Sequence, residues 1–178
     1  MSILKTMKRI QLKDFTFLVK PAHYARDWKH AEVTTAMEAE LPNAPLLVAI
    51  GDEPLHFQVR LSIPPSGYVG LCAYHLDSVF ASVGVNAHSL RAFTMMRSVP
   101  SNITLPFTST STYLIWHLEW DTGAVRIGYQ ANEESEIQWV GSFELPGTTK
   151  SVSFGAFFAS SGEAYRATIE HVRVQALY

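Results

Sequence analysis

Apolar and polar residues alternate most strictly between Tyr113 and Gln130, where the sequence reads YLIWHLEWDTGAVRIGYQ. A period of two is typical of β-strands, in which successive side chains point to opposite faces. Asp121-Thr122-Gly123 interrupts the alternation with turn-forming residues, so the stretch predicts a β-hairpin. One strand face gathers Leu114, Trp116, Leu118 and Trp120. Because so much apolar surface must be buried, we expect these residues to pack against a second sheet, with both tryptophans in the core.

The same alternation recurs along the chain, with turn residues between successive runs. The clearest further run is Leu55–Ile63, and Tyr68–Leu76 and Val79–Asn86 form a pair around Asp77-Ser78. Further strands are predicted at Phe15–Val19, Leu46–Ile50, Leu90–Arg97, Ile137–Phe143, Ser151–Ala159 and Thr168–Leu177. Roughly ten to twelve short strands separated by turns indicate an all-β fold, a two-sheet antiparallel β-sandwich of jelly-roll type.

Three segments have a weaker pattern. His23–Leu41 is predicted to be strand or irregular, with a short helix as the rival, because its helical spacing lacks large apolar residues. Ser98–Ser111, rich in Ser, Thr and Pro, is predicted to be a loop, and residues 1–14 an N-terminal arm or first edge strand. Since no repeat or linker divides the chain, residues 1–178 are predicted to form one domain.

Composition narrows the function classes. The 178 residues carry a formal net charge of −2, without the concentrated basic surface that nucleic-acid binding needs. No apolar run is long enough to span a bilayer, and Met1–Phe15 lacks the pattern of a secretory signal. Cys72 is the single cysteine, so no internal disulfide can form, and its position in a strand predicts a buried, inert thiol. We therefore expect a cytoplasmic protein that binds neither nucleic acid nor membrane.

The segment Gly70–Asn86 (GLCAYHLDSVFASVGVN) carries a resemblance to a known family. It resembles a small, functionally uncharacterised family of bacterial and fungal domains within the concanavalin A-like lectin/glucanase superfamily. Gly70-Leu71, Asp77 and Gly84 match the family's pattern, and later segments up to Leu177 resemble its remaining strands in order. The departures fall at charged and aromatic positions of the family's motif. They are Tyr74 in place of Arg, Phe80 in place of Trp, Ser82 in place of Lys and Asn86 in place of Glu.

The resemblance implies a curved sandwich whose concave face binds or cleaves saccharides in related proteins. By strand alternation, this face is expected to collect the polar residues of the central strands, which are Gln58, Arg60, Tyr74, Ser82, Asn86, His117, Glu119, Arg126 and Gln130. The predicted ligand contacts among them are Arg60, Tyr74, Asn86, His117, Glu119 and Arg126, because such groups bond sugar hydroxyls. The alternative is an ordinary solvated sheet face whose residues satisfy one another.

A hydrolase is a further alternative, since some glucanases of the superfamily use Glu-x-Asp-x-Glu or Glu-x-Asp-x-x-Glu. Glu119-Trp120-Asp121 matches the first two carboxylates. The third position falls on Gly123 or Ala124, so the second catalytic acid is missing and no catalytic residue is predicted.

The seven histidines are scattered without the spacing of a zinc site, so no metal ligand is predicted. No nucleotide-binding or serine-hydrolase motif is present, and no cofactor is expected. The sequence thus favours a non-catalytic recognition module that binds a saccharide or similar polar ligand. The alternative is a protein-interaction or regulatory domain that uses a sheet edge or the segment Ser98–Ser111.

Overall fold

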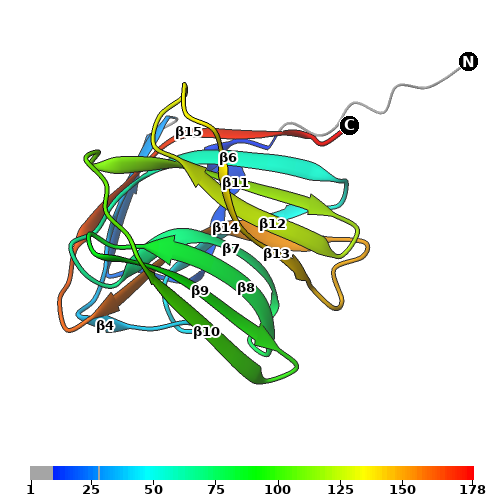
Figure 1. Ribbon diagram of the computed structural model, residues 1–178, viewed down its shortest axis with the longest axis horizontal. Helices are drawn as coiled ribbons and strands as arrows, with labels where there is room; N and C mark the ends of the chain where they lie inside the picture. Colours follow the sequence, from blue (N-terminus) through cyan, green and yellow to red (C-terminus); the bar gives the residue numbers. More distant parts are fainter. Residues whose placement is uncertain (1–9, 28) are drawn as a thin grey trace, which may run out of the picture.

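The computed structural model describes residues 10–27 and 29–178, and in this part of the chain the strands form two antiparallel sheets that pack face to face (Figure 1). This confirms the predicted all-β sandwich. The first sheet is eight-stranded, in the order β1-β5-β14-β7-β8-β9-β10, with β4 paired to β14. Its strands are β1 (Thr16–Val19), β4 (Glu38–Ala39), β5 (Leu46–Gly51), β7 (Tyr68–Leu76), β8 (Val79–Val85), β9 (Ser89–Met96), β10 (Val99–Pro106) and β14 (Val152–Ser161).

The second sheet is seven-stranded, in the order β13-β12-β11-β6-β15-β3-β2, and lies above the first in Figure 1. Its strands are β2 (His23–Arg26), β3 (His30–Thr34), β6 (Leu55–Ser62), β11 (Tyr113–Asp121), β12 (Ala124–Gln130), β13 (Gln138–Glu144) and β15 (Arg166–Ala176). Within the described residues no helix is long and apolar enough to cross a membrane.

The core lies between the two sheets, where the alternating pattern predicts it. Trp116 and Trp120 are each 1% exposed and pack with the inward residues of both sheets. The hairpin that carries them pairs Asp121 with Ala124, and Thr122 and Gly123 take φ values of 43° and 92° in the turn. Two consecutive positive φ values match the twist of the flanking strands, which explains the compact turn at this point.

The weakly patterned segments form strands where sequence reading was least decisive. Ser98–Ser111 is not a loop as predicted, because residues 99–106 form β10, the edge strand of the eight-stranded sheet. Every residue of β10 is exposed. Because neither face of this strand is buried, its sequence lacks the alternation of apolar and polar residues that marks the other strands. Within His23–Leu41 the chain forms β2, β3 and β4, which excludes the rival helix.

The predicted N-terminal arm or edge strand lies partly outside the described residues. Its described part includes a short 3₁₀ turn at Leu12–Asp14, and the edge strand β1 begins only at Thr16.

Candidate functional site

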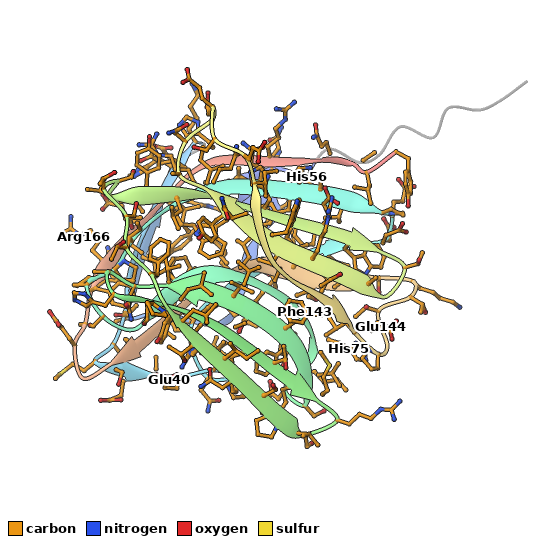
Figure 2. All side chains as sticks on the ribbon, viewed as in Figure 1. Glu40, His56, His75, Phe143, Glu144 and Arg166 are labelled. Atoms are coloured by element: carbon orange, nitrogen blue, oxygen red, sulfur yellow. The ribbon has the colours of Figure 1, made fainter. Side chains whose placement is uncertain are left out.

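The six predicted ligand contacts do not lie on one face. Arg60, His117, Glu119 and Arg126 belong to β6, β11 and β12 of the seven-stranded sheet. Tyr74 lies on β7, and Asn86 directly follows β8, in the other sheet. Strand alternation separates inward from outward side chains but does not say to which sheet a strand belongs. Because the outward faces of the two layers point away from each other, the prediction that all six residues share one face is wrong. In Figure 2, His56 on β6 lies on the upper side of the sandwich and Glu40 lies on the lower side.

The outward face of the eight-stranded sheet is filled by the protein's own apolar side chains. Leu46, Val48, Cys72, Phe80 and Phe157 form a buried cluster there, separate from the core between the sheets. A Cβ at Gly84 would come within 2.6 Å of the Phe157 ring, so this glycine makes room for that ring across the sheet. Burial also raises the pKa of the Cys72 thiol well above its usual range, in keeping with the predicted inert thiol.

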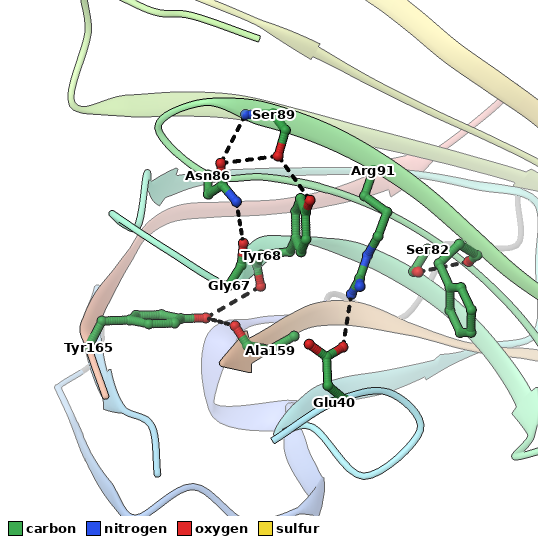
Figure 3. Close-up of polar contacts among 10 residues, drawn as sticks. Glu40, Gly67, Tyr68, Ser82, Asn86, Ser89, Arg91, Ala159 and Tyr165 are labelled. Atoms are coloured by element: carbon green, nitrogen blue, oxygen red, sulfur yellow. Dashed lines mark hydrogen bonds and ion pairs between the residues drawn. The ribbon is translucent and has the colours of Figure 1, made fainter. Parts of the chain in front are cut away.

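Polar groups on this face are also engaged with the protein itself (Figure 3). Asn86 donates from Nδ2 to the Gly67 carbonyl at 2.8 Å and accepts from the backbone N–H of Ser89 at 2.9 Å, which closes the turn after β8. Ser82 donates to the Phe93 carbonyl at 2.8 Å. The Tyr74 hydroxyl bonds to Asp77, and its ring stacks on Phe80.

Arg91 on β9 completes the cover of this face. Its guanidinium carbon lies 4.2 Å from the centre of the Tyr68 ring, and Nη2 pairs with Glu40 at 3.3 Å (Figure 3). Tyr74, Phe80, Ser82 and Asn86 are the positions where the sequence departs from the family's motif. Here they hold internal contacts, which favours a structural role for this face.

The outward face of the seven-stranded sheet is polar, and cross-strand pairing sets its order. Glu119 lies opposite His56 on β6 and opposite Arg126 on β12. Arg126 donates to Glu119 Oε2 from both Nε and Nη2 at 2.8 Å, and its guanidinium carbon lies 3.8 Å from the centre of the Trp139 ring. These contacts hold the Glu119 carboxylate in a charge-assisted pair with Arg126.

Two histidines bond directly to each other beside this ion pair. His56 Nε2 lies 2.8 Å from His117 Nδ1, and His117 Nε2 lies 2.6 Å from Gln130 Oε1. His117 is only 3% exposed, and burial lowers the pKa of both imidazoles below the ordinary value of 6.5. The lowered pKa values favour the neutral form of both imidazoles, in which each of these hydrogen bonds requires a specific tautomer.

A pocket of about 350 Å³ opens on this face over β6 and β11. It is lined by Gln58, Arg60, Tyr113, Ile115, Asn132, Glu133, Glu134 and His171. Of the six predicted contacts only Arg60 lines it, while His117, Glu119 and Arg126 lie in the adjoining network. The guanidinium carbon of Arg60 lies 3.5 Å from the centre of the Tyr113 ring, which holds the charge over the pocket floor.

Two irregular segments form the walls of this pocket. On one side the register of β15 shifts between Glu170 and Arg173, and His171 takes a φ of 54° in this bulge. A β-bulge redirects a side chain, and here it brings His171 to the pocket. On the other side the turn between β12 and β13, drawn in yellow in Figure 1, carries Asn132, Glu133 and Glu134.

Sequence reasoning missed most of the lining residues. Strand alternation places Tyr113 on the polar face, but an aromatic residue on that face does not by itself indicate a pocket. Glu133 and Glu134 lie in a turn without any periodicity, and a bulge such as that at His171 leaves no signal in the pattern. Within residues 10–27 and 29–178, no group of three or more His, Cys, Asp and Glu side chains is placed to hold a metal ion.

Solved structures of other proteins share the fold of this chain. No protein-family model and no curated protein matches the chain. A functionally unknown protein from Saccharomyces cerevisiae superposes with a TM-score of 0.82 at 14% identity, over 95% of this chain and 100% of the other. The carbohydrate-binding module CBM66 from Bacillus subtilis superposes with a TM-score of 0.60 at 11% identity, covering 92% and 96%.

The GH43 protein BlXynB from Bacillus licheniformis gives a TM-score of 0.73 at 14% identity, where this chain covers only 37% of the other. At such identities the likeness shows a shared β-sandwich fold.

Proposed function

We propose that this protein is a non-catalytic recognition module that binds a saccharide in the pocket over β6 and β11. The observation that carries the proposal is the lining of this pocket. It combines donors and acceptors around one aromatic ring, on a face where Arg60 is held in place before any ligand arrives. That the structural neighbours include a carbohydrate-binding module supports the proposal.

The lining suits a polyhydroxylated ligand. A sugar hydroxyl both donates and accepts hydrogen bonds, and the pocket offers donors from Arg60 and Gln58 and acceptors from Glu133 and Glu134. The lining carries one positive charge on Arg60 and two negative charges on Glu133 and Glu134, which disfavours a strongly anionic ligand. The volume of about 350 Å³ lies at the lower end of the range of about 300–1,000 Å³ for small-molecule pockets. We therefore expect a short saccharide or the end of a longer one.

The carboxylates of this face support recognition without hydrolysis. Glycoside hydrolysis needs two carboxyl groups that flank the scissile bond. Glu119 is bound by Arg126, and the Asp121 carboxylate bonds to the Tyr178 hydroxyl, so both are engaged with the protein. Glu133 and Glu134 are adjacent in one turn and contribute to the same wall of the pocket.

A glycan array followed by titration calorimetry tests the proposal. The hit from the array is titrated into the wild type, the variant Arg60→Ala and the control Arg166→Ala. Arg166 is an exposed arginine at the start of β15, whose Nη1 lies 3.9 Å from Glu32. We expect Arg60→Ala to weaken binding at least tenfold and Arg166→Ala to leave it unchanged. An array without a hit, or equal affinities for all three proteins, contradicts the proposal.

The edge strand β10 favours a second candidate, a protein-interaction domain without a small-molecule ligand. Val99, Ile103 and Leu105 are 66%, 57% and 51% exposed on this strand. Exposed aliphatic side chains along a sheet edge are typical of a surface that binds another polypeptide. This candidate predicts a protein complex of fixed stoichiometry that Ile103→Lys abolishes and Arg60→Ala leaves intact, as measured by light scattering on the purified complex.

A further inference from the structure

A continuous chain of hydrogen bonds runs from the middle of the seven-stranded sheet to the wall of the pocket. It begins at His56 on β6, crosses to His117 on β11 at 2.8 Å and reaches Gln130 at the end of β12 at 2.6 Å. Gln130 then donates from Nε2 to the Ser135 carbonyl at 2.7 Å. Ser135 belongs to the turn that carries the pocket residues Asn132, Glu133 and Glu134. This series of hydrogen bonds therefore links the middle of the sheet to the pocket wall.

The last bond fixes the direction of all the others. Because the Gln130 amide nitrogen faces Ser135, its Oε1 faces His117, and a carbonyl oxygen can only accept a hydrogen bond. His117 Nε2 must therefore carry the proton. In a neutral imidazole the other nitrogen, Nδ1, is then an acceptor, and it accepts from His56 Nε2. The remaining acceptor nitrogen of the two histidines is therefore His56 Nδ1, which lies 3.9 Å from Glu119 Oε1.

The turn that Gln130 anchors is closed on itself. Asn132 Oδ1 accepts from the backbone N–H of Glu134 at 2.9 Å and from the backbone N–H and the hydroxyl of Ser135, both at 3.0 Å. Such an Asn-centred turn is a compact unit. Its position relative to the sheet therefore depends on how it is fastened, and the bond from Gln130 to Ser135 supplies a fastening.

We propose that His117 and Gln130 are positioning residues of the saccharide pocket, which hold the wall formed by Asn132, Glu133 and Glu134 in place. His117 orients the Gln130 amide, and Gln130 fastens the turn. The effect on ligand affinity rests on the proposed function, whereas the fastening of the turn does not.

The arrangement also determines where an added proton goes. His56 Nδ1 is the open acceptor, and Glu119 faces it from β11 while Arg126 on β12 and Arg173 on β15 oppose its positive charge. Protonation there adds a donor toward Glu119 and leaves His56 Nε2 donating to His117 as before. The bond to Gln130 is therefore unchanged, and the turn stays fastened through the pH range in which His56 takes up its proton.

Nuclear magnetic resonance on the wild type and three variants tests this proposal. Gln130→Met removes the amide that fastens the turn, and His117→Leu removes the donor that orients it. His117→Gln retains an N–H near the position of Nε2 and is the rescue variant. The three readouts are the His117 tautomer from long-range ¹H–¹⁵N correlations, amide hydrogen exchange in residues 131–136, and the affinity for the saccharide.

We expect His117 of the wild type to carry its proton on Nε2 at pH 7. In Gln130→Met and His117→Leu, exchange in residues 131–136 should rise at least tenfold while the core strands stay protected, and affinity should fall about tenfold. His117→Gln should restore both. An Nδ1–H tautomer, which is read on the wild type and needs no variant to fold, overturns the proposal. Unchanged exchange in folded Gln130→Met also overturns it. If no saccharide binds but the tautomer and exchange are as expected, the proposed function fails and the fastening stands.

Discussion

The guanidinium carbon of Arg60 lies 3.5 Å from the centre of the Tyr113 ring, on the outward face of the seven-stranded sheet. The two residues are diagonal neighbours, because Arg60 pairs with Ile115 while Tyr113 pairs with Ser62. Long side chains reach across such a diagonal. Stacking restricts the guanidinium before a ligand binds, and this reduces the ordering that binding requires.

Replacement of Tyr113 should therefore weaken the pocket through Arg60. Tyr113→Leu removes the ring, and we expect a loss of about 0.5–1 kcal/mol in saccharide binding, the usual size of an exposed cation–π contact. Tyr113→Phe keeps the ring and should bind within a factor of about two of the wild type. Titration calorimetry measures both. Equal losses in the two variants would assign the effect to the hydroxyl instead of the ring.

Removal of Arg126 should change both stability and the titration of His56. Arg126 bonds Glu119 and disfavours the charged form of His56, so Arg126→Ala should raise the pKa of His56. Because Arg126 is 45% exposed, we expect only about 1 kcal/mol of lost stability. The matched control Arg166→Ala should lose less than about 0.5 kcal/mol, since its pair with Glu32 is exposed. Urea unfolding and histidine resonances against pH measure these effects, and an unshifted His56 titration would contradict this role of Arg126.

Acidification should destabilise the protein through His56 and His117. Burial lowers the pKa of both in the folded state, so between the folded and unfolded pKa values the unfolded chain binds more protons. This contribution to stability is therefore complete above about pH 6.5, falls as the pH falls below it, and levels off once the folded groups are protonated. The slope is at most about 1.4 kcal/mol per pH unit for each proton.

Urea unfolding between pH 4.5 and pH 8 measures this dependence. His56→Gln keeps a donor toward His117 and should flatten the profile. Identical profiles for the wild type and His56→Gln would show that His56 does not contribute.

The two tryptophans of β11 and the tryptophan of β13 should differ sharply in their contributions to folding stability. Trp116 and Trp120 are each 1% exposed, so replacement of either by Ala should cost about 3–5 kcal/mol of stability. Trp139 lies half-buried on the outward face against Arg126, and Trp139→Ala should cost clearly less, about 1–2 kcal/mol. Chemical unfolding measures all three, and similar losses would contradict the assignment of faces.

The core could be predicted from the sequence because burial imposes a period of two on each strand. Leu114, Trp116, Leu118 and Trp120 point inward as their alternation predicts. The strand β10 could not be predicted in this way, since it is exposed along its length and has no buried side to mark. Its chain direction depends instead on the Arg97-Ser98 turn, where both residues take positive φ values without the help of glycine.

The site could be predicted only in part. Alternation correctly places Arg60, His117, Glu119 and Arg126 outward, but the assignment of strands to sheets depends on long-range pairing that the sequence does not display. Alternation alone therefore predicts one face for Tyr74, Asn86 and the outward residues of the other sheet, which lie on opposite sides of the molecule. His171 reaches the pocket only because the β15 register shifts beside it, which depends on the paired strand β6.

The central claim is that the ligand pocket lies on the outward face of the seven-stranded sheet. Its most direct test is chemical-shift mapping of the ¹⁵N-labelled protein during titration with the saccharide selected by the glycan array. We predict that the shifts concentrate at Arg60, Tyr113, Asn132, Glu134 and His171. Shifts centred on Tyr74, Phe93 and Met95 of the other sheet, or no localised shifts at all, would contradict it.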